Sequence, residues 1–278
     1  MPTTRPPSLR HPAVVALLDV LEVDADTFAT VLELCEGGDL DGLMREHKAR
    51  GTLPEREARC LMVQIFSGLR YLASRRIIHY DLKPANILFD SLGQAKITDF
   101  GLSKMVSEGQ TQAGIELTSQ GAGTYWYLPP EAFETGGPAP PRISNKLDVW
   151  SAGVIFYSLL YGKKPYGESM SQEQMLRERV MAVQREVEFP ARPTVSPEAK
   201  DFIRRCLAWQ QDARPDVEAA ATDPYLVGGP AAAAAAAAAT AGAGGAGSGA
   251  TGQQAAGAGH GIGRGMSLGL GTVLNSRR

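Results

Sequence analysis

The first 36 residues of this chain contain no glycine, and the first lysine is Lys48. Glycines let a backbone loop approach phosphate groups closely, and a lysine commonly supplies the cation that pairs with them. Residues 1–36 therefore hold neither a Gly-rich phosphate loop nor a phosphate-pairing lysine.

Cysteine is also scarce, and charge of one sign does not dominate. The cysteines, Cys35, Cys60 and Cys206, are odd in number and have no CxxC spacing, which argues against a disulfide framework and a structural zinc site and favours a reducing compartment. The chain has 28 basic and 30 acidic residues, so no basic field predicts a nucleic-acid or anionic-membrane partner. No apolar run approaches the roughly 20 residues that span a bilayer.

Both termini lack the residues that build a core. Residues 228–278 are rich in alanine and glycine, and we predict a disordered tail there. Residues 1–10 are expected to be a disordered lead. A transit peptide is the alternative, but three prolines among the first seven residues oppose an amphipathic helix.

Between these termini the sequence predicts a mixed α+β domain over about residues 11–227. Apolar runs around an acidic turn predict an antiparallel hairpin over 14–35, and helical spacing of apolar residues predicts a long helix over 54–73. The other expected elements are a short helix after Asp39, strands at 86–89 and 95–98, and helices at 145–161, 172–185, 197–208 and 217–221.

One short loop, HYDLKPANILFD at residues 79–90, concentrates the residues that carry chemistry. It contains Asp81, Lys83 and Asn86, and Asp99 follows thirteen residues after Asn86 in an Asp-Phe-Gly sequence. Phosphoryl transfer needs a carboxylate that orients the attacking hydroxyl, a cation for the transferring phosphate, and oxygen ligands for Mg²⁺. Asp81, Lys83 and the pair of Asn86 with Asp99 supply these groups in turn. Any single acid here could be a solvated loop residue, but the combined spacing argues against coincidence.

With these motifs the chain resembles a eukaryotic protein kinase, from the middle of the small lobe to the end of the large lobe. The resemblance implies an α+β protein-kinase-like fold, with a remnant of the β small lobe at 11–36 and a mostly helical large lobe at 37–227. It also implies ATP and Mg²⁺ as cofactors and protein substrates as partners.

The same resemblance assigns structural roles in the large lobe. Glu131, in Pro-Pro-Glu where the family usually has Ala-Pro-Glu, is expected to pair with Arg214. Asp148, at the start of the central helix, is expected to accept hydrogen bonds from the backbone of the catalytic loop. Such buried groups are costly to leave unpaired.

The subfamily follows from longer motifs. Lys83, two residues after Asp81, and Thr124, in GAGTYWYLPPE, make the chain resemble serine/threonine kinases. In that family Thr124 is expected to position the substrate. HYDLKPANIL, ITDFGLSK, ISNKLDVWSAGVIF and LYGKKPYG together closely resemble the Tousled-like kinases, which carry tyrosine at the position of Tyr80. That family implies a nuclear, chromatin-associated role, with the cytoplasm as the alternative location, and histone chaperones as substrates. Its coiled-coil oligomerisation element is not present in these residues.

Tyr80 stands where the usual arginine would pair with a phosphate on the activation segment, at about 99–131. Because tyrosine cannot supply that charge, we predict that the segment is held by its own packing, with residues 125–127 as anchors. Thr118 and Ser119 remain candidate phosphorylation sites.

The nucleotide pocket is only partly present. The resemblance makes residues 33–35, Glu33 to Cys35, the hinge whose backbone meets adenine, with Leu32 as gatekeeper. It places Asp39 on the ribose and Leu88 under the base, while Asn86 and Asp99 hold the metal. For the leucines, plain core packing is an equally simple interpretation.

Three interpretations of function remain open. The first is a serine/threonine protein kinase, of which these residues by themselves are expected to be inactive. The second is a truncated, non-catalytic scaffold or binding module. We favour the first, because a two-stranded hairpin exposes an unpaired edge and is marginal alone. The third is a small-molecule kinase, which the fit of residues 118–131 to a peptide-positioning segment opposes.

Overall fold

The structure is a computed structural model, and it describes residues 9–24, 27–50, 52–107, 115–116, 123–133, 142–228 and 272–273. The expectations for the lead, at 1–8, and for most of the tail lie outside the described residues. The candidate phosphorylation sites Thr118 and Ser119 also lie outside them.

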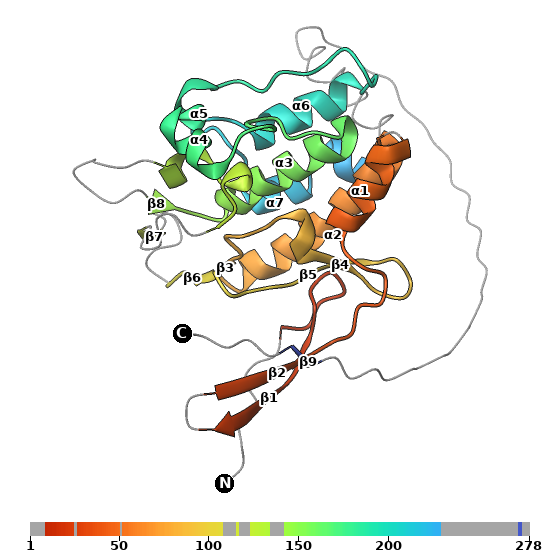
Figure 1. Ribbon diagram of the computed structural model, residues 1–278, viewed down its shortest axis with the longest axis vertical. Coiled ribbons are helices and arrows are strands. Elements are labelled where there is room, and N and C mark those ends of the chain that lie inside the picture. The colour runs from red at the N-terminus through yellow and green to blue at the C-terminus, as the bar shows by residue number, and fades with distance from the viewer. Residues whose placement is uncertain are drawn as a thin grey trace, which may run out of the picture.

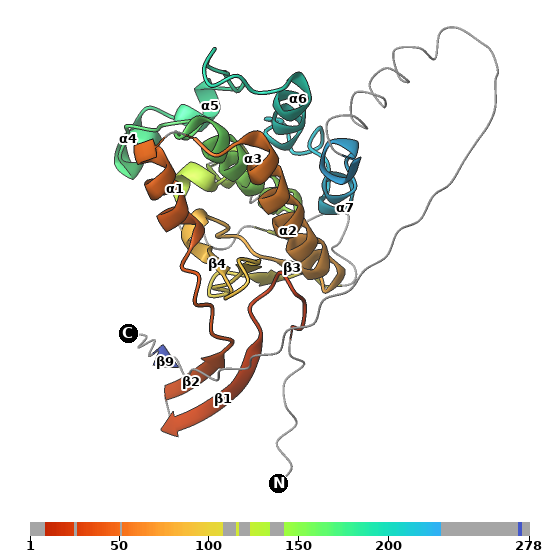
Figure 2. The same ribbon diagram turned by 90° about the vertical axis from the view of Figure 1, so that its right-hand side faces the viewer.

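A β-hairpin projects from one end of a helical body (Figures 1 and 2). Strands β1 (Leu17–Asp24) and β2 (Thr27–Leu32) pair antiparallel, and the short strand β9 (Thr272–Val273) pairs with the other edge of β2. Several apolar side chains of the hairpin are exposed, including Leu21 and Phe28. The predicted hairpin is therefore present, with much of its apolar surface uncovered in the described residues.

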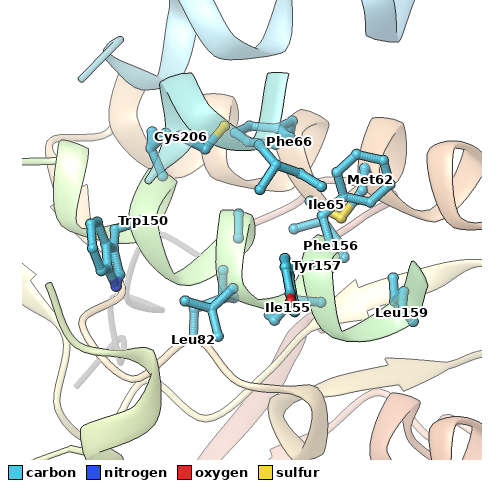
Figure 3. Close-up of a cluster of buried hydrophobic side chains, with 14 of the residues drawn as sticks. Met62, Ile65, Phe66, Leu82, Trp150, Ile155, Phe156, Tyr157, Leu159 and Cys206 are labelled. Carbon is cyan, nitrogen blue, oxygen red and sulfur yellow. The ribbon is translucent and has the colours of Figure 1, made fainter. Parts of the chain in front are cut away.

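The helical body is organised around α3 (Lys146–Tyr161), whose residues from Leu147 onward are all buried. A helix that is apolar on every side belongs in an interior, and α3 contacts α2 (Glu55–Ser74) and α6 (Pro197–Cys206). Figure 3 shows side chains of these three helices meeting in one cluster. Helix α3 ends at Gly162, whose positive φ of 66° forms a left-handed cap.

The helical body also contains α1 (Leu40–Arg50) and the short helix α7 (Val217–Ala221). The region predicted as one helix at 172–185 is instead two short helices, α4 (Gln172–Arg177) and α5 (Val180–Val183). Ser171 and Gln174 form a capping box that starts α4. Arg179, with φ of 49°, interrupts the helical path, which apolar spacing alone did not reveal.

Short strands and single 3₁₀ turns connect these helices and build the loops of the site. Among the described residues they pair as β3 with β6, β4 with β5 and β7 with β8, all antiparallel. Their bounds are β3 (Ile77–Ile78), β4 (Ile87–Phe89), β5 (Ala95–Ile97), β6 (Lys104–Met105), β7 (Ile115–Glu116), β8 (Arg142–Ile143), η1 (Pro84–Asn86), η3 (Tyr125–Tyr127) and η4 (Pro130–Phe133).

Backbone hydrogen bonds join the chain before the hairpin to β5. The N–H of Val15 donates to the carbonyl of Ile97 at 2.9 Å, and the N–H of Ile97 donates to that of Ala13 at 2.9 Å. The described residues combine helices with antiparallel strands, in agreement with the predicted α+β class. Within the described residues, no helix combines the length and the apolar character needed to cross a membrane.

Candidate active site

The candidate catalytic loop, residues 79–86, follows β3, and Asp148 holds its backbone in place. The carboxylate of Asp148 accepts hydrogen bonds from the backbone N–H groups of His79, at 2.8 Å, and Tyr80, at 2.9 Å. Asp148 is only 1% exposed. Burial raises the pKa of Asp148, while the His79 side chain and the two backbone N–H groups act in the opposite direction. This geometry matches the role that the resemblance gave to Asp148.

Asp81 lies at the centre of a hydrogen-bonded cluster with Lys83 and Thr124. Its Oδ2 accepts from Lys83 Nζ at 2.7 Å, and its Oδ1 accepts from the backbone N–H of Thr124 at 3.1 Å and from Thr124 Oγ1 at 3.0 Å. Lys83 Nζ also donates to Thr124 Oγ1 at 3.1 Å. Forty-three residues of sequence separate Asp81 from Thr124, so only the fold brings this carboxylate to the activation segment.

Asn86 is positioned by Asp81 and by the strand that leads to Asp99. The side-chain Nδ2 of Asn86 donates to the backbone carbonyl of Asp81 at 2.9 Å. The backbone carbonyl of Asn86 accepts from the N–H of Thr98 at 3.0 Å. Because the amide nitrogen is used in this way, the amide oxygen is the group that can face a cation. Asp99 is exposed, has a φ of 62°, and accepts a hydrogen bond from the N–H of Gly101 at 3.3 Å.

The residues present fit a metal that brings most of its own ligands. No group of three or more His, Cys, Asp and Glu side chains that could hold a metal occurs in the described parts of the chain. Asn86 and Asp99 would instead supply two oxygen ligands. Mg²⁺ usually keeps several waters and binds through one or two carboxylates plus substrate phosphates, so a sparse oxygen site is what it requires.

His79 connects the catalytic loop to the Asp-Phe-Gly segment. Its Nε2 lies 2.9 Å from the carbonyl oxygen of Thr98, and its ring meets the ring of Phe100 edge to face at 5.2 Å between centroids. The side chain is fully buried. His79 therefore fixes the residues on both sides of Asp99 to the catalytic loop, a positioning role that the sequence alone did not indicate.

The segment after Thr124 is anchored by its aromatic residues. Trp126 Nε1 donates to the carbonyl of Gly167 at 2.9 Å, and the carbonyl of Tyr127 accepts from Ser151 Oγ at 2.8 Å. Tyr125 packs edge to face on Phe133 at 5.5 Å. These contacts are of the kind that the sequence analysis expected of residues 125–127.

Tyr80 is buried in an apolar cluster. Its side chain is 1% exposed and packs with Leu128 and Ala132, on the segment that follows Thr124, and with Ile143 in β8 and Leu147 in α3. Lys104 Nζ lies 5.9 Å from the centroid of the ring. Tyr80 thus contacts the activation segment through apolar packing, and burial raises the pKa of its hydroxyl.

Glu131 and Arg214 form a bidentate ion pair inside the helical body. Arg214 Nη1 lies 2.8 Å from Glu131 Oε1, and Nη2 lies 3.1 Å from Oε2. Arg214 also donates to the carbonyl groups of Lys146 and Ala208, so its guanidinium is extensively hydrogen-bonded. This is the pairing that the resemblance implied.

The candidate nucleotide residues lie along the connection between β2 and α1. Asp39 and Leu88 form a backbone bridge, which places the candidate ribose and adenine contacts next to each other. Asp39 Oδ1 accepts from the N–H of Gly42 at 2.7 Å, so this carboxylate also caps the start of α1. Cys35 is half-buried, and burial raises the pKa of its thiol.

Lys96 is the main residue at this pocket that the sequence analysis missed. It is 7% exposed, and its Nζ lies 2.8 Å from Glu33 Oε1, while Glu33 Oε2 accepts from the N–H of Ala16 at 3.1 Å. Lys96 is also the strand partner of Leu88. A lysine in the middle of the apolar strand Ala95–Ile97 was the available signal, because only a partner makes its burial tolerable.

A family model described as the protein kinase domain matches residues 7–226. The serine/threonine-protein kinase TOUSLED of Arabidopsis thaliana is 56% identical over 222 residues, which cover 79% of this chain and 32% of that protein. Serine/threonine-protein kinase tousled-like 2 of Homo sapiens is 53% identical over 226 residues, covering 79% of this chain and 29% of that protein. Tousled-like 1 of Caenorhabditis elegans is 50% identical over 218 residues, covering 76% and 22%.

The chain therefore belongs to the protein kinase family, with the Tousled-like kinases as its subgroup. The predicted fold class and family are confirmed. The chain spans about a third of the length of the curated relatives that it matches. Protein kinases in general use ATP and a divalent metal.

Proposed function

We propose that the protein to which this chain belongs is a serine/threonine protein kinase that transfers the γ-phosphate of ATP to protein hydroxyl groups. The observation that supports this most strongly is the cluster of Asp81, Lys83 and Thr124. The Asp81 carboxylate accepts hydrogen bonds from the ammonium group of Lys83 and from Thr124 of the activation segment. Such a carboxylate can orient a substrate hydroxyl and accept its proton.

The roles of the other residues follow from their positions. Lys83, 2.7 Å from Asp81 Oδ2, provides positive charge where negative charge develops on the transferring group. Asn86 and Asp99 would hold Mg²⁺, which when bound neutralises charge on the nucleotide phosphates. Thr124 positions the substrate segment beside Asp81. Glu33, Cys35, Asp39 and Leu88 would surround the nucleoside, with the backbone of residues 33–35 meeting the base.

The finer assignments rest on the relatives. We propose a nuclear, chromatin-associated protein that phosphorylates histone chaperones, as the resemblance to Tousled-like kinases implies. The sequence identity of 50–56% to proteins named Tousled or tousled-like supports the subgroup on which these assignments depend.

A second candidate is a non-catalytic scaffold. This candidate applies to these 278 residues taken alone, within which no glycine precedes Gly37 and no lysine precedes Lys48. Binding of Mg²⁺ and a nucleotide distinguishes the two candidates, because a scaffold needs neither.

The test uses the complete protein with Asp81→Asn and Asp99→Ala. Asp81→Asn should leave ATP binding intact and lower turnover by about 10²–10⁴-fold, the usual scale for a lost acid–base group. Asp99→Ala should abolish Mg²⁺-dependent nucleotide binding. Near-wild-type turnover in both variants would refute the roles assigned here, and phosphate transfer to a metabolite but to no protein would favour a small-molecule kinase.

A further inference from the structure

A groove of about 980 Å³ lies between α1, the start of α2 and the turn after β4. Leu43 and His47 come from α1, residues 53–61 supply the second wall, and residues 89–93 supply the third. We call it the α1–α2 groove; both helices can be followed in Figures 1 and 2. Its lining includes none of the catalytic residues, yet its third wall begins only three residues after Asn86.

The floor of the α1–α2 groove is apolar. Leu53 and Phe89 are buried beneath it, and Leu43 and Leu61 are half-buried along it. Leu92, in the turn between two lining residues, is 83% exposed. Exposed apolar surface that adjoins an apolar cleft is typical of a binding surface rather than of a solvated face.

The rim of the groove is acidic. The lining has three carboxylates, from Glu36, Glu57 and Asp90, and one guanidinium, from Arg56. With His47 neutral, the net charge of the lining is therefore −2. Glu36 and Glu57 are exposed, and within the described residues neither forms an ion pair. Asp90 is already used in part, since its Oδ1 accepts from the N–H groups of Leu92 and Gln94.

We propose that the α1–α2 groove docks an extended segment of a protein substrate in which basic residues stand beside a pair of apolar residues. Apolar side chains would cover Leu43 and Leu61, and the cations would meet Glu36 and Glu57. A second copy of this chain is a poor occupant, because a symmetric contact would bring two acidic rims together. The proposal rests on the proposed function only in naming substrates as the source of the segment.

The experiment measures binding and needs no phosphate transfer, so its failure is distinct from failure of the proposed function. The probe is a fluorescein-labelled, cysteine-free octapeptide with two arginines followed by a leucine, a spacer and a second leucine. Fluorescence anisotropy with the 278-residue chain should show saturable binding. Glu36→Lys with Glu57→Lys should weaken the affinity at least tenfold, because the rim charge is reversed at two exposed positions.

Two controls locate the site. Glu186→Lys with Glu188→Lys makes the same charge change at exposed residues outside the groove and should leave the affinity within twofold. Cys60 is exposed and lines the groove, so saturating peptide should slow its alkylation about tenfold without changing that of the half-buried Cys35. Thermal unfolding of each variant confirms that it is folded.

Several results would overturn the proposal. They are no saturable binding, equal binding of a peptide with glutamates in place of the arginines, and an affinity unchanged by the Glu36 and Glu57 substitutions. Protection of Cys60 that depends on chain concentration without peptide would assign the groove to a second copy instead.

Discussion

Arg214 meets Glu131 through two parallel hydrogen bonds, with N–O distances of 2.8 and 3.1 Å, although 83 residues separate them in the sequence. The Arg214 side chain is fully buried, and its guanidinium also lies 5.0 Å from the centroid of the Trp150 ring. The pair therefore ties the segment after Thr124 to the end of the helical body. Removing one partner would leave a buried charge without compensation.

We expect Glu131→Gln or Arg214→Met alone to lower the free energy of unfolding by about 3–5 kcal/mol, the usual cost of breaking a buried pair on one side. The double variant should cost less than the sum, because it leaves neither charge unpaired. Urea unfolding followed by circular dichroism measures all three. As the matched control, Arg70→Met breaks the exposed pair with Glu218 and should cost under about 1 kcal/mol. Equal costs at the two sites would contradict the argument.

The 278-residue chain by itself should show little or no kinase activity. Asp81 and Asp99 cannot position an ATP molecule whose phosphates are held from one side only, and within these residues no lysine precedes Lys48 and no glycine precedes Gly37. Transfer of labelled phosphate from ATP to a generic basic protein is the assay. Robust turnover that is lost in Asp81→Asn would show this expectation to be wrong.

Activity of the complete enzyme should not depend on capture of an activation-segment phosphate by residue 80. A phosphate brings a charge of about −1.5 to −2 and needs a cation to order a loop, whereas Tyr80 is buried among apolar side chains. Phosphatase treatment, or Thr118→Ala with Ser119→Ala, should lower the rate by less than about tenfold, under roughly 1.4 kcal/mol of barrier. Tyr80→Arg should not raise it.

The rival account is that Lys104 or Arg142 captures the phosphate instead. Lys104 Nζ lies 5.9 Å from the centroid of the Tyr80 ring, so Lys104 is the first residue to substitute. A hundredfold loss on dephosphorylation, reproduced by Lys104→Met or Arg142→Met, would support the rival.

Stability should fall above about pH 9 through Cys206. Burial raises the pKa of this thiol above the 9.0 of an exposed cysteine, so the folded chain keeps a proton that the unfolded chain releases. The contribution of Cys206 to the free energy of unfolding is therefore constant well below pH 9 and decreases as the pH rises above 9. From pH 7.5 to 9.5 the wild type should lose about 0.8 kcal/mol more than Cys206→Ala. Parallel pH profiles of the two proteins would exclude this contribution.

The sequence by itself determined the family and most of the helices and strands, and it indicated the candidate site. The spacing of Asp81, Lys83 and Asn86 predicted a loop around one carboxylate, because these residues are close along the chain and a local turn brings them together. Apolar periodicity predicted α2 for the same local reason. It did not reveal the break at Arg179, where one residue leaves the helical path.

The tertiary structure alone decided which distant side chains meet. Nothing in the spacing of Lys96 and Glu33 predicts an ion pair, and the burial of Lys96 is tolerable only because the fold brings that carboxylate within 2.8 Å. Likewise Thr124 reaches Asp81, and Tyr80 finds its apolar neighbours, only when the activation segment folds back over the catalytic loop. Short-range order follows from local sequence, whereas contacts between distant segments depend on how the helices and strands pack around one core.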